Sequence, residues 1–144
     1  MHILLVEDNR ADGELIRLGF EGHGFGGTLD WVRDGEEALD YISKQNGHTS
    51  AQTPDLILLD LNLPKRHGKE VLRFIKESEE HCVVPVIIMS SSQDPHDVNA
   101  CYQLHANGYM RKPLDFASLK ALIDSLLEFW SHHIVLPMTP HPSA

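Results

Sequence analysis

The chain has few cysteines, no long apolar segment and a shortage of basic residues. Cys82 and Cys101 are its only cysteines, and they form neither a C-x-x-C metal motif nor a disulfide framework. We interpret both as small core residues in a reducing cytosol. The longest apolar run, residues 83–89, is too short to cross a membrane, and the N-terminus lacks the basic start of a signal peptide. We therefore expect a cytoplasmic protein that is neither secreted nor membrane-bound.

The charge balance is acidic, with 12 Lys and Arg against 21 Asp and Glu in 144 residues and a net charge of −9. Such a surface repels a polyphosphate backbone, so direct nucleic-acid binding is not expected, and cations or basic protein surfaces are better candidate partners. The length suits one domain. We assign it to residues 1–133, followed by a C-terminal tail over residues 134–144 with three prolines in its last eight residues.

Short β-prone segments alternate with amphipathic segments along this domain. The expected strands are residues 2–6, 28–32, 55–60, 83–89 and 107–110. The expected helices are residues 11–21, residues 36–44, a segment through Val71 that ends near Glu80, residues 94–105 and residues 115–133. This alternation predicts an α/β fold, a doubly wound five-stranded parallel sheet with helices on both faces. Five units favour the flavodoxin-like strand order 2-1-3-4-5.

Polar side chains stand at the carboxyl ends of four expected strands. They are Glu7 and Asp8 after the first strand, Asp60 after the third, Ser90 after the fourth and Lys112 after the fifth. Ligands of an open parallel sheet bind outside these strand ends, so we expect the five side chains to converge. Crowded carboxylates repel one another, and Mg²⁺ relieves that repulsion while keeping positions open for a phosphate. Lys112 would then neutralise phosphoryl charge, and Ser90 would donate a hydrogen bond to it.

The joint spacing of these residues resembles that of two-component response-regulator receiver domains over about residues 2–130. Thirty residues separate Asp60 from Ser90, twenty-two separate Ser90 from Lys112, and Pro113 follows. The resemblance implies a CheY-like fold and one role for each matching residue. Asp60 would be the phosphoacceptor, Asp8 a direct Mg²⁺ ligand, Glu7 an acid acting through a metal-bound water, the backbone carbonyl of Asn62 a further ligand, Ser90 the switch hydroxyl, Lys112 the phosphate-binding lysine and Tyr109 the aromatic that rotates inward on activation. A cis peptide between Lys112 and Pro113 would aim the ammonium into the cleft.

Residues 60–68 and the long loop before the third strand are more specifically similar to small stand-alone regulators paired with bacterial phytochrome kinases. The implied function is a switch rather than an enzyme: Asp60 accepts a phosphoryl group from a histidine kinase and slowly hydrolyses it. The signal would pass to an effector protein or a phosphotransfer protein. This sequence departs from the pattern of the family at two places. The first bears on the choice of partner protein, and the second bears on the lifetime of the phosphorylated form. Arg66 and His67 alter the loop after Asp60, and Ser92 lacks the acid or amide that positions the hydrolytic water in some relatives.

Two other functions fit the sequence less well than this switch. A phosphohydrolase with Asp60 as a turnover nucleophile needs an acid just beyond it, where Asn62 stands, and a cap for which the chain has no room. A flavin binder needs a phosphate-cradling loop after the first strand, where Glu7 and Asp8 would repel the phosphate. The Gly-rich residues 21–27 follow a helix and enter a strand, which places them on the opposite rim as turn residues. The ten histidines show no ligand spacing and are interpreted as surface residues.

The last expected helix carries more apolar residues than one packed face needs. The sheet-facing set is Leu119, Leu122, Ile123, Leu126 and Trp130. The surplus is Phe116, Leu127, Phe129, Ile134, Val135 and Leu136. A monomer seldom leaves so large an apolar patch in water, so we expect a two-fold homodimer through this surface, resembling the helix-four, strand-five, helix-five dimers of receiver domains. The alternative is that the tail folds back over its own helix.

Overall fold

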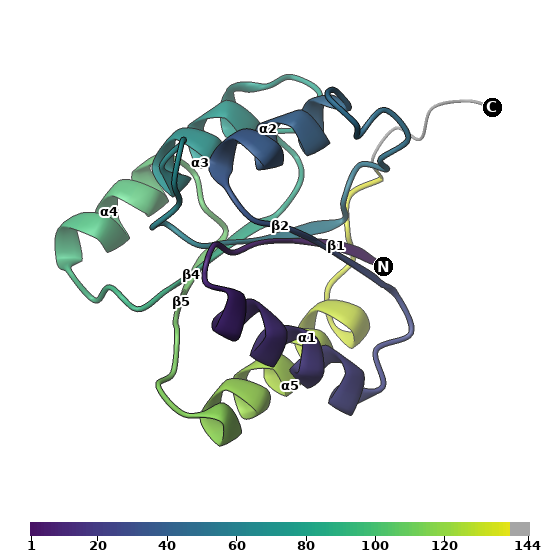
Figure 1. Ribbon diagram of the computed structural model, residues 1–144, viewed down its shortest axis with the longest axis vertical. Coiled ribbons are helices and arrows are strands. Elements are labelled where there is room, and N and C mark those ends of the chain that lie inside the picture. The colour runs from purple at the N-terminus through teal and green to yellow at the C-terminus, as the bar shows by residue number, and fades with distance from the viewer. Residues whose placement is uncertain (139–144) are drawn as a thin grey trace.

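Five parallel strands form one sheet in the order β2-β1-β3-β4-β5, which confirms the predicted fold class (Figure 1). The computed structural model describes residues 1–138. Its strands are β1 His2–Val6, β2 Thr28–Val32, β3 Leu56–Leu59, β4 Val86–Ser90 and β5 Gly108–Arg111. Its helices are α1 Arg10–His23, α2 Gly35–Ser43, α3 Gly68–Glu77, α4 Pro95–Gln103 and α5 Phe116–His132. None of the helices in this part of the chain is long and apolar enough to cross a bilayer.

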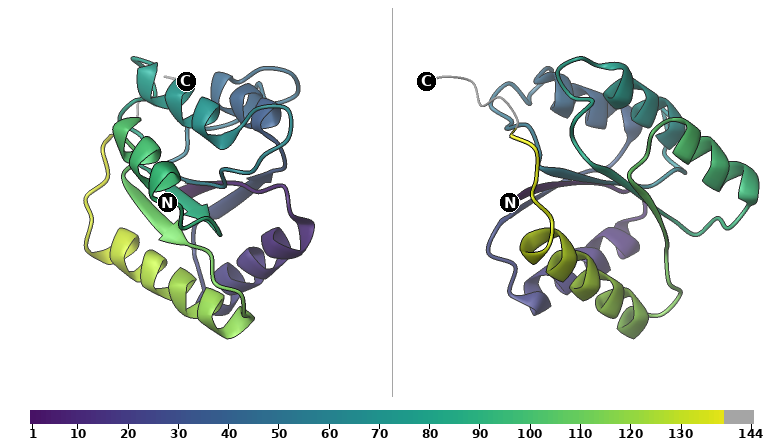
Figure 2. Two further views of the ribbon diagram at one scale, coloured as in Figure 1. Left: turned by 90° about the vertical axis from the view of Figure 1, so that its left-hand side faces the viewer. Right: turned by 180° about the vertical axis from the view of Figure 1, so that it is seen from behind.

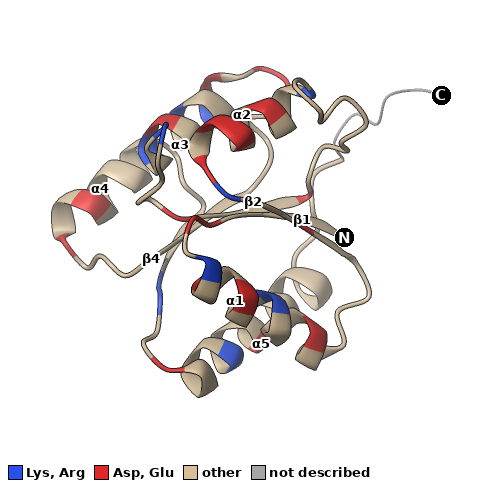
Figure 3. Ribbon diagram, viewed as in Figure 1, with Lys and Arg blue, Asp and Glu red and all other residues tan. Residues whose placement is uncertain are grey.

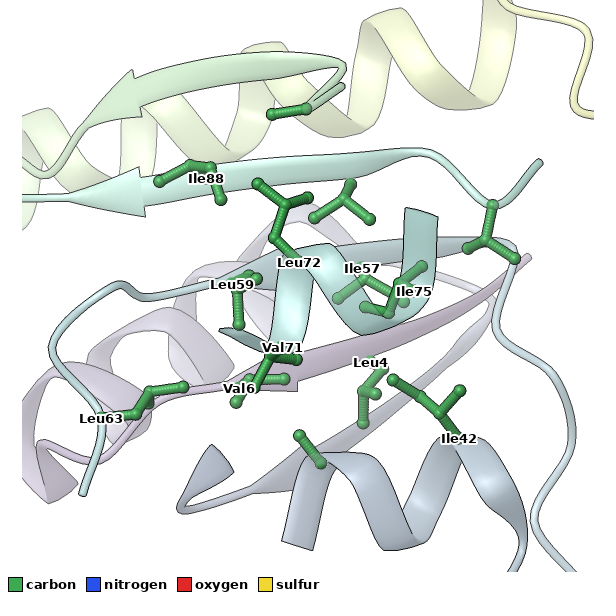
Figure 4. Packing of buried hydrophobic residues seen from close by; sticks show 14 of the residues in the cluster. Leu4, Val6, Ile42, Ile57, Leu59, Leu63, Val71, Leu72, Ile75 and Ile88 are labelled. Carbon is green, nitrogen blue, oxygen red and sulfur yellow. The ribbon is translucent and has the colours of Figure 1, made fainter. Parts of the chain in front are cut away.

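Helices cover both faces of the sheet, with α1 and α5 on one side and α2, α3 and α4 on the other (Figures 1 and 2). The three central strands are therefore buried along their whole length, which explains why their sequences are continuous apolar runs. Figure 4 shows one of the two cores, where Leu4 and Ile57 of the sheet meet Leu72 and Ile75 of α3 and Ile42 of α2. This packing holds the carboxyl ends of β1, β3 and β4 in fixed register.

The segment between α3 and β4 differs from the sequence prediction. Helix α3 ends at Glu77 instead of near Glu80, because Ser78 already has extended backbone angles of φ −79° and ψ 126°. Strand β4 begins at Val86 instead of residue 83, since the preceding Pro85 has no N–H to donate to a strand ladder. The chain between them makes turns that leave Val83 exposed. Cys82 in this turn is half-exposed, so its assignment to the core was wrong, whereas Cys101 is buried as predicted.

Three further side chains lie deeper than the sequence indicated. Leu127, assigned to the outward surface of the last helix, is fully buried with Ile123 against the sheet. His2 and His81 are buried, so the surface interpretation was wrong for these two histidines. His2 belongs to a strand covered on both faces, and its Nε2 lies 2.6 Å from the hydroxyl oxygen of Tyr41.

The Gly-rich turn and the start of the tail meet at the amino ends of the strands, away from the predicted site. Gly24 ends α1 in the left-handed conformation with φ 75°, as a helix-terminating glycine does. The described part of the tail leaves α5 and runs past this edge of the sheet (Figures 1 and 2). There Ile134 and Leu136 line a cavity of about 410 Å³ together with Met1 and Trp130. Residues 139–144 of the predicted tail lie outside the described residues.

Candidate functional site

One ammonium group brings three carboxylates together at the carboxyl end of the sheet. The Nζ atom of Lys112 lies 3.1 Å from both carboxylate oxygens of Glu7, 3.2 Å from Oδ2 of Asp60 and 3.1 Å from Oδ2 of Asp12. Figure 3 shows the acidic turn after β1 and the basic end of β5 on the same side of the molecule. The structure thus brings Glu7, Asp60 and Lys112 together, as the strand ends predicted.

Main-chain hydrogen bonds place these residues by continuing the sheet past the strand ends. The Glu7 amide donates to the Val32 carbonyl at 3.1 Å, and the Asp60 amide donates to the Val6 carbonyl at 3.0 Å. The Lys112 amide donates to the Ser90 carbonyl at 2.8 Å. Each functional side chain therefore starts from a backbone fixed on a neighbouring strand.

The expected cis peptide before Pro113 is not found, because the bond between Lys112 and Pro113 is trans. That part of the resemblance was wrong for this structure. The hydrogen bond from the Lys112 amide to Ser90 already sets the direction in which the chain leaves β5, and the ammonium reaches Asp60 from there.

Burial and surplus negative charge dominate the electrostatics of the site. Glu7 is 1% exposed and Asp60 7% exposed, and the Lys112 side chain is 10% exposed. Burial, and next the nearby Asp60 carboxylate, raise the pKa of Glu7 to about 8, although Lys112 partly opposes the rise. Burial alone would lower the pKa of Lys112, but the charges of Asp60 and Glu7 outweigh burial and raise it. One ammonium does not balance this set of carboxylates.

The available oxygen donors fit a hard divalent cation. Glu7 and Asp60 supply buried carboxylate oxygens, and the raised pKa of Glu7 marks a site that would gain from further positive charge. Asp8 and Asn62, the other two predicted ligands, lie exposed at the rim. Within residues 1–138 the side chains of His, Cys, Asp and Glu form no preassembled group of three arranged to hold a metal ion. Carboxylates, a main-chain carbonyl and water are the donor set that Mg²⁺ takes.

The loop after β3 approaches the phosphoacceptor candidate so closely that only glycine fits at the start of α3. A Cβ atom on Gly68 would lie 2.4 Å from the Asp60 carbonyl oxygen and 2.6 Å from the Leu61 Cα. The Gly68 amide donates to the Leu61 carbonyl at 2.9 Å, and the Asn62 amide donates to Oδ1 of Asp60 at 3.2 Å. The loop thus fixes one carboxylate oxygen of Asp60, while Oδ2 faces Lys112.

Ser92 links the two predicted switch residues. Its amide donates to Oγ of the buried Ser90 at 3.2 Å, and the hydroxyl of Tyr109 donates to its carbonyl at 2.8 Å. The Ser92 hydroxyl donates to Oδ2 of Asp97 in α4 at 2.6 Å, and Lys69 of α3 donates to Oδ1 of Asp97 at 2.8 Å. Ser90 and Tyr109 are therefore joined through one loop residue, which binds Asp97 of α4 and through Asp97 is linked to Lys69 of α3.

The sequence did not reveal Asp12, Asp97 or Lys69 as residues of this network. Asp12 lies in the first turn of α1 and the other two lie in later helices, whereas the search for chemistry followed strand ends. The sequence carries no signal for Asp12, because its contact with Lys112 depends on how α1 is oriented after the N-cap Asn9. Nothing in the sequence pairs Lys69 with Asp97, which are 28 residues apart.

Comparison with known proteins agrees with this geometry. The family model described as the response regulator receiver domain matches residues 3–124. The response regulator Rcp1 of Synechocystis is 36% identical over 94% of this chain and 92% of its own. FilR2 of Methanothrix harundinacea, described as a probable methanogenesis regulatory protein, is 44% identical over 89% of this chain and 82% of its own.

Solved structures give the same result. The phosphorylated cyanobacterial phytochrome response regulator RcpA superposes with a TM-score of 0.90 at 39% identity, covering 94% of this chain and 97% of RcpA. The Mn²⁺-bound form of Rcp1 superposes with a TM-score of 0.89 at 33% identity, covering 96% of this chain and all of that one. On its fold, its strand-end residues and these matches, the chain belongs to the response regulator receiver domain family.

Proposed function

We propose that this receiver domain is a phosphorylation switch in which Asp60 accepts a phosphoryl group from a partner histidine kinase in the cytoplasm. The observation that carries the proposal is the buried Asp60 carboxylate, held at Oδ1 by the Asn62 amide and facing the Lys112 ammonium at 3.2 Å from Oδ2. A carboxylate oxygen so oriented can attack phosphorus in line, and the ammonium can bind the oxygens of the transferring group. The acyl phosphate is then hydrolysed slowly on the protein itself.

Mg²⁺ is the proposed cofactor, held by Glu7, Asp8, Asp60 and the backbone carbonyl of Asn62. The cation would supply positive charge to the phosphoryl oxygens. The surplus of carboxylates around one ammonium supports this assignment, and the Mn²⁺-bound form of Rcp1 is a precedent for divalent metal in a similar protein. Glu7, which would act through a metal-bound water, would lose its proton when the cation binds, because a nearby positive charge favours the carboxylate form.

Ser90 and Tyr109 are the proposed readout of phosphorylation. Oγ of Ser90 accepts a hydrogen bond from Ser92, so its own hydroxyl hydrogen stays available for a phosphoryl oxygen. Movement of Ser90 pulls on the same residue that holds the Tyr109 hydroxyl. The site is thereby coupled to β5 and α4, which contact Ser92 through Tyr109 and Asp97, and to α3, whose Lys69 binds Asp97. An effector protein, a phosphotransfer protein or a second copy of the chain would read this change.

Similarity to RcpA, which is described as a cyanobacterial phytochrome response regulator, favours a phytochrome-type kinase as the partner. The competing function, a phosphohydrolase for an external substrate, lacks an acid next to the nucleophile, because Asn62 occupies that position.

Phosphorylation by a small acyl phosphate with Mg²⁺ tests the proposal. The parent protein should become labelled, and omission of the divalent cation should prevent labelling. Asp60→Asn should lose the label and keep its circular dichroism spectrum, because the amide is a far poorer nucleophile of nearly the same shape. Asp94→Asn, which preserves an N-cap residue type at α4, is the matched control and should label normally. Labelling of folded Asp60→Asn at the parental level would refute the assignment.

A further inference from the structure

The third carboxylate on Lys112 has no role in the function proposed so far. Asp12 lies in the first turn of α1, where its amide donates to Oδ1 of Asn9 at 3.0 Å, so the helix start is capped without help from the Asp12 carboxylate. That carboxylate is 34% exposed and contacts Nζ of Lys112 at 3.1 Å. The Asp12 carboxylate at the mouth of the site is therefore free to serve a role other than helix capping.

Phosphorylation replaces the Asp60 carboxylate beside Lys112 with a more negative phosphoryl group, which competes with Glu7 and Asp12 for the N–H donors of the ammonium. In the transfer, the bond from phosphorus to the donor's leaving group breaks, the leaving group keeps the electron pair, and a carboxylate oxygen of Asp60 bonds to phosphorus. The product adds negative charge beside Lys112. The ammonium has three N–H donors, and Glu7, Asp12 and Asp60 already receive them.

We propose that Asp12 is a positioning residue that holds Lys112 in the unphosphorylated protein and is the partner that Lys112 releases to bind the phosphoryl group. Of the three carboxylates, Asp12 is the most exposed, so water can solvate it most readily after release. Glu7 is buried and would be left without solvent. This inference rests on the proposed phosphorylation of Asp60.

Release from Asp12 adds to the barrier for phosphoryl transfer, so its removal should speed phosphorylation. Asp12→Asn should be labelled by a small acyl phosphate about two- to fivefold faster than the parent at equal Mg²⁺, the size expected for a partly exposed ion pair. Asp12→Glu keeps a carboxylate and should return toward the parental rate. Glu14→Gln removes one negative charge from the same helix at a residue that pairs with Arg17 instead, and should leave the rate unchanged.

Nuclear magnetic resonance of the Lys112 side chain tests the resting contact without any phosphorylation. Its Cε and Nζ resonances should shift in Asp12→Asn and stay in place in Glu14→Gln. Unchanged resonances, a labelling rate in Asp12→Asn at or below that of the parent, or equal acceleration by Glu14→Gln would each overturn the inference. If the parent itself is not labelled at Asp60, the proposed function fails instead, and the resonances still decide whether Asp12 holds Lys112.

Discussion

Glu7 is the residue whose ionisation the fold most opposes. Its pKa in the folded protein is about 8, against 4.5 when unperturbed, because of burial and then the charge of Asp60. The folded state therefore binds this proton more tightly than the unfolded state does. The stability that Glu7 confers is fully present below pH 4.5 and is lost as the pH rises through about 8.

Glu7→Gln should therefore stabilise the metal-free protein in a pH-dependent way. We expect a gain of about 1–3 kcal/mol in the free energy of unfolding near pH 8 and little gain near pH 5. Urea unfolding with a chelator at both pH values measures it. Glu36→Gln, at an exposed position in α2, should show no such pH dependence. A difference between Glu7→Gln and the parent that is constant with pH would contradict the buried, protonated carboxyl.

A variant of Asp8 tests metal binding without affecting folding. Asp8 is exposed, and its side chain makes no hydrogen bond or ion pair within the described residues. Asp8→Ala should keep the parental stability and weaken Mg²⁺ binding by about tenfold or more, the loss expected when a carboxylate ligand is removed. Titration calorimetry measures the affinity. The Trp31 indole, which donates to the Glu7 carbonyl at 2.9 Å, gives an independent fluorescence signal. Equal Mg²⁺ affinity in Asp8→Ala and the parent would remove Asp8 from the ligand set.

Site residues at strand ends could be predicted from the sequence, because parallel topology forces those ends together. Glu7, Asp60 and Lys112 meet for that reason. Asp12 could not be found in this way, since its contact depends on how α1 is oriented after the turn at Asn9. The prediction of a cis peptide before Pro113 was wrong, because tertiary contacts that the sequence does not display decide the isomer of an X–Pro bond.

At the scale of elements, buried strands were easier to predict than their boundaries. The continuous apolar run of β3 leaves no choice of face, whereas Val83 looks like part of β4 and yet lies exposed in the preceding turn. That turn is held by Lys76 of α3, whose Nζ donates to the carbonyls of Cys82 at 3.2 Å and Val84 at 2.9 Å and to Oδ1 of Asn107 at 2.9 Å. A lysine in an amphipathic helix gives no sign of such a role.

Lys76→Met should accordingly destabilise the connection between α3 and β4. Burial lowers the pKa of Lys76, and its removal leaves carbonyl acceptors without their donor. We expect a loss of about 1–3 kcal/mol in the free energy of unfolding, measured in urea. Lys120→Met, which removes a partly exposed i,i+4 partner of Asp124, is the control and should cost at most about 0.5 kcal/mol. Equal losses of unfolding free energy in both variants would mean that the contacts of Lys76 with the carbonyls do not stabilise the turn.

At the scale of the whole molecule, the apolar surplus of α5 is smaller than the sequence indicated but still present. Leu127, which the sequence analysis placed on the outward surface, is buried in the core, and Ile134 and Leu136 line the cavity at the amino edge of the sheet. Phe129 nevertheless remains 51% exposed and Val135 96% exposed. A second copy of the chain, paired about a two-fold axis, would cover these side chains.

Deleting residues 134–144 and replacing Phe129 with Asp should therefore shift the molecular mass from light scattering towards that of the monomer. Val83→Asp places the same charge at an equally exposed apolar position on the α3–β4 turn, and should leave the mass unchanged. The measurement is made with and without phosphorylation, and a difference would show that the switch controls association. A parent protein that is monomeric at high micromolar concentration in both states would refute the dimer.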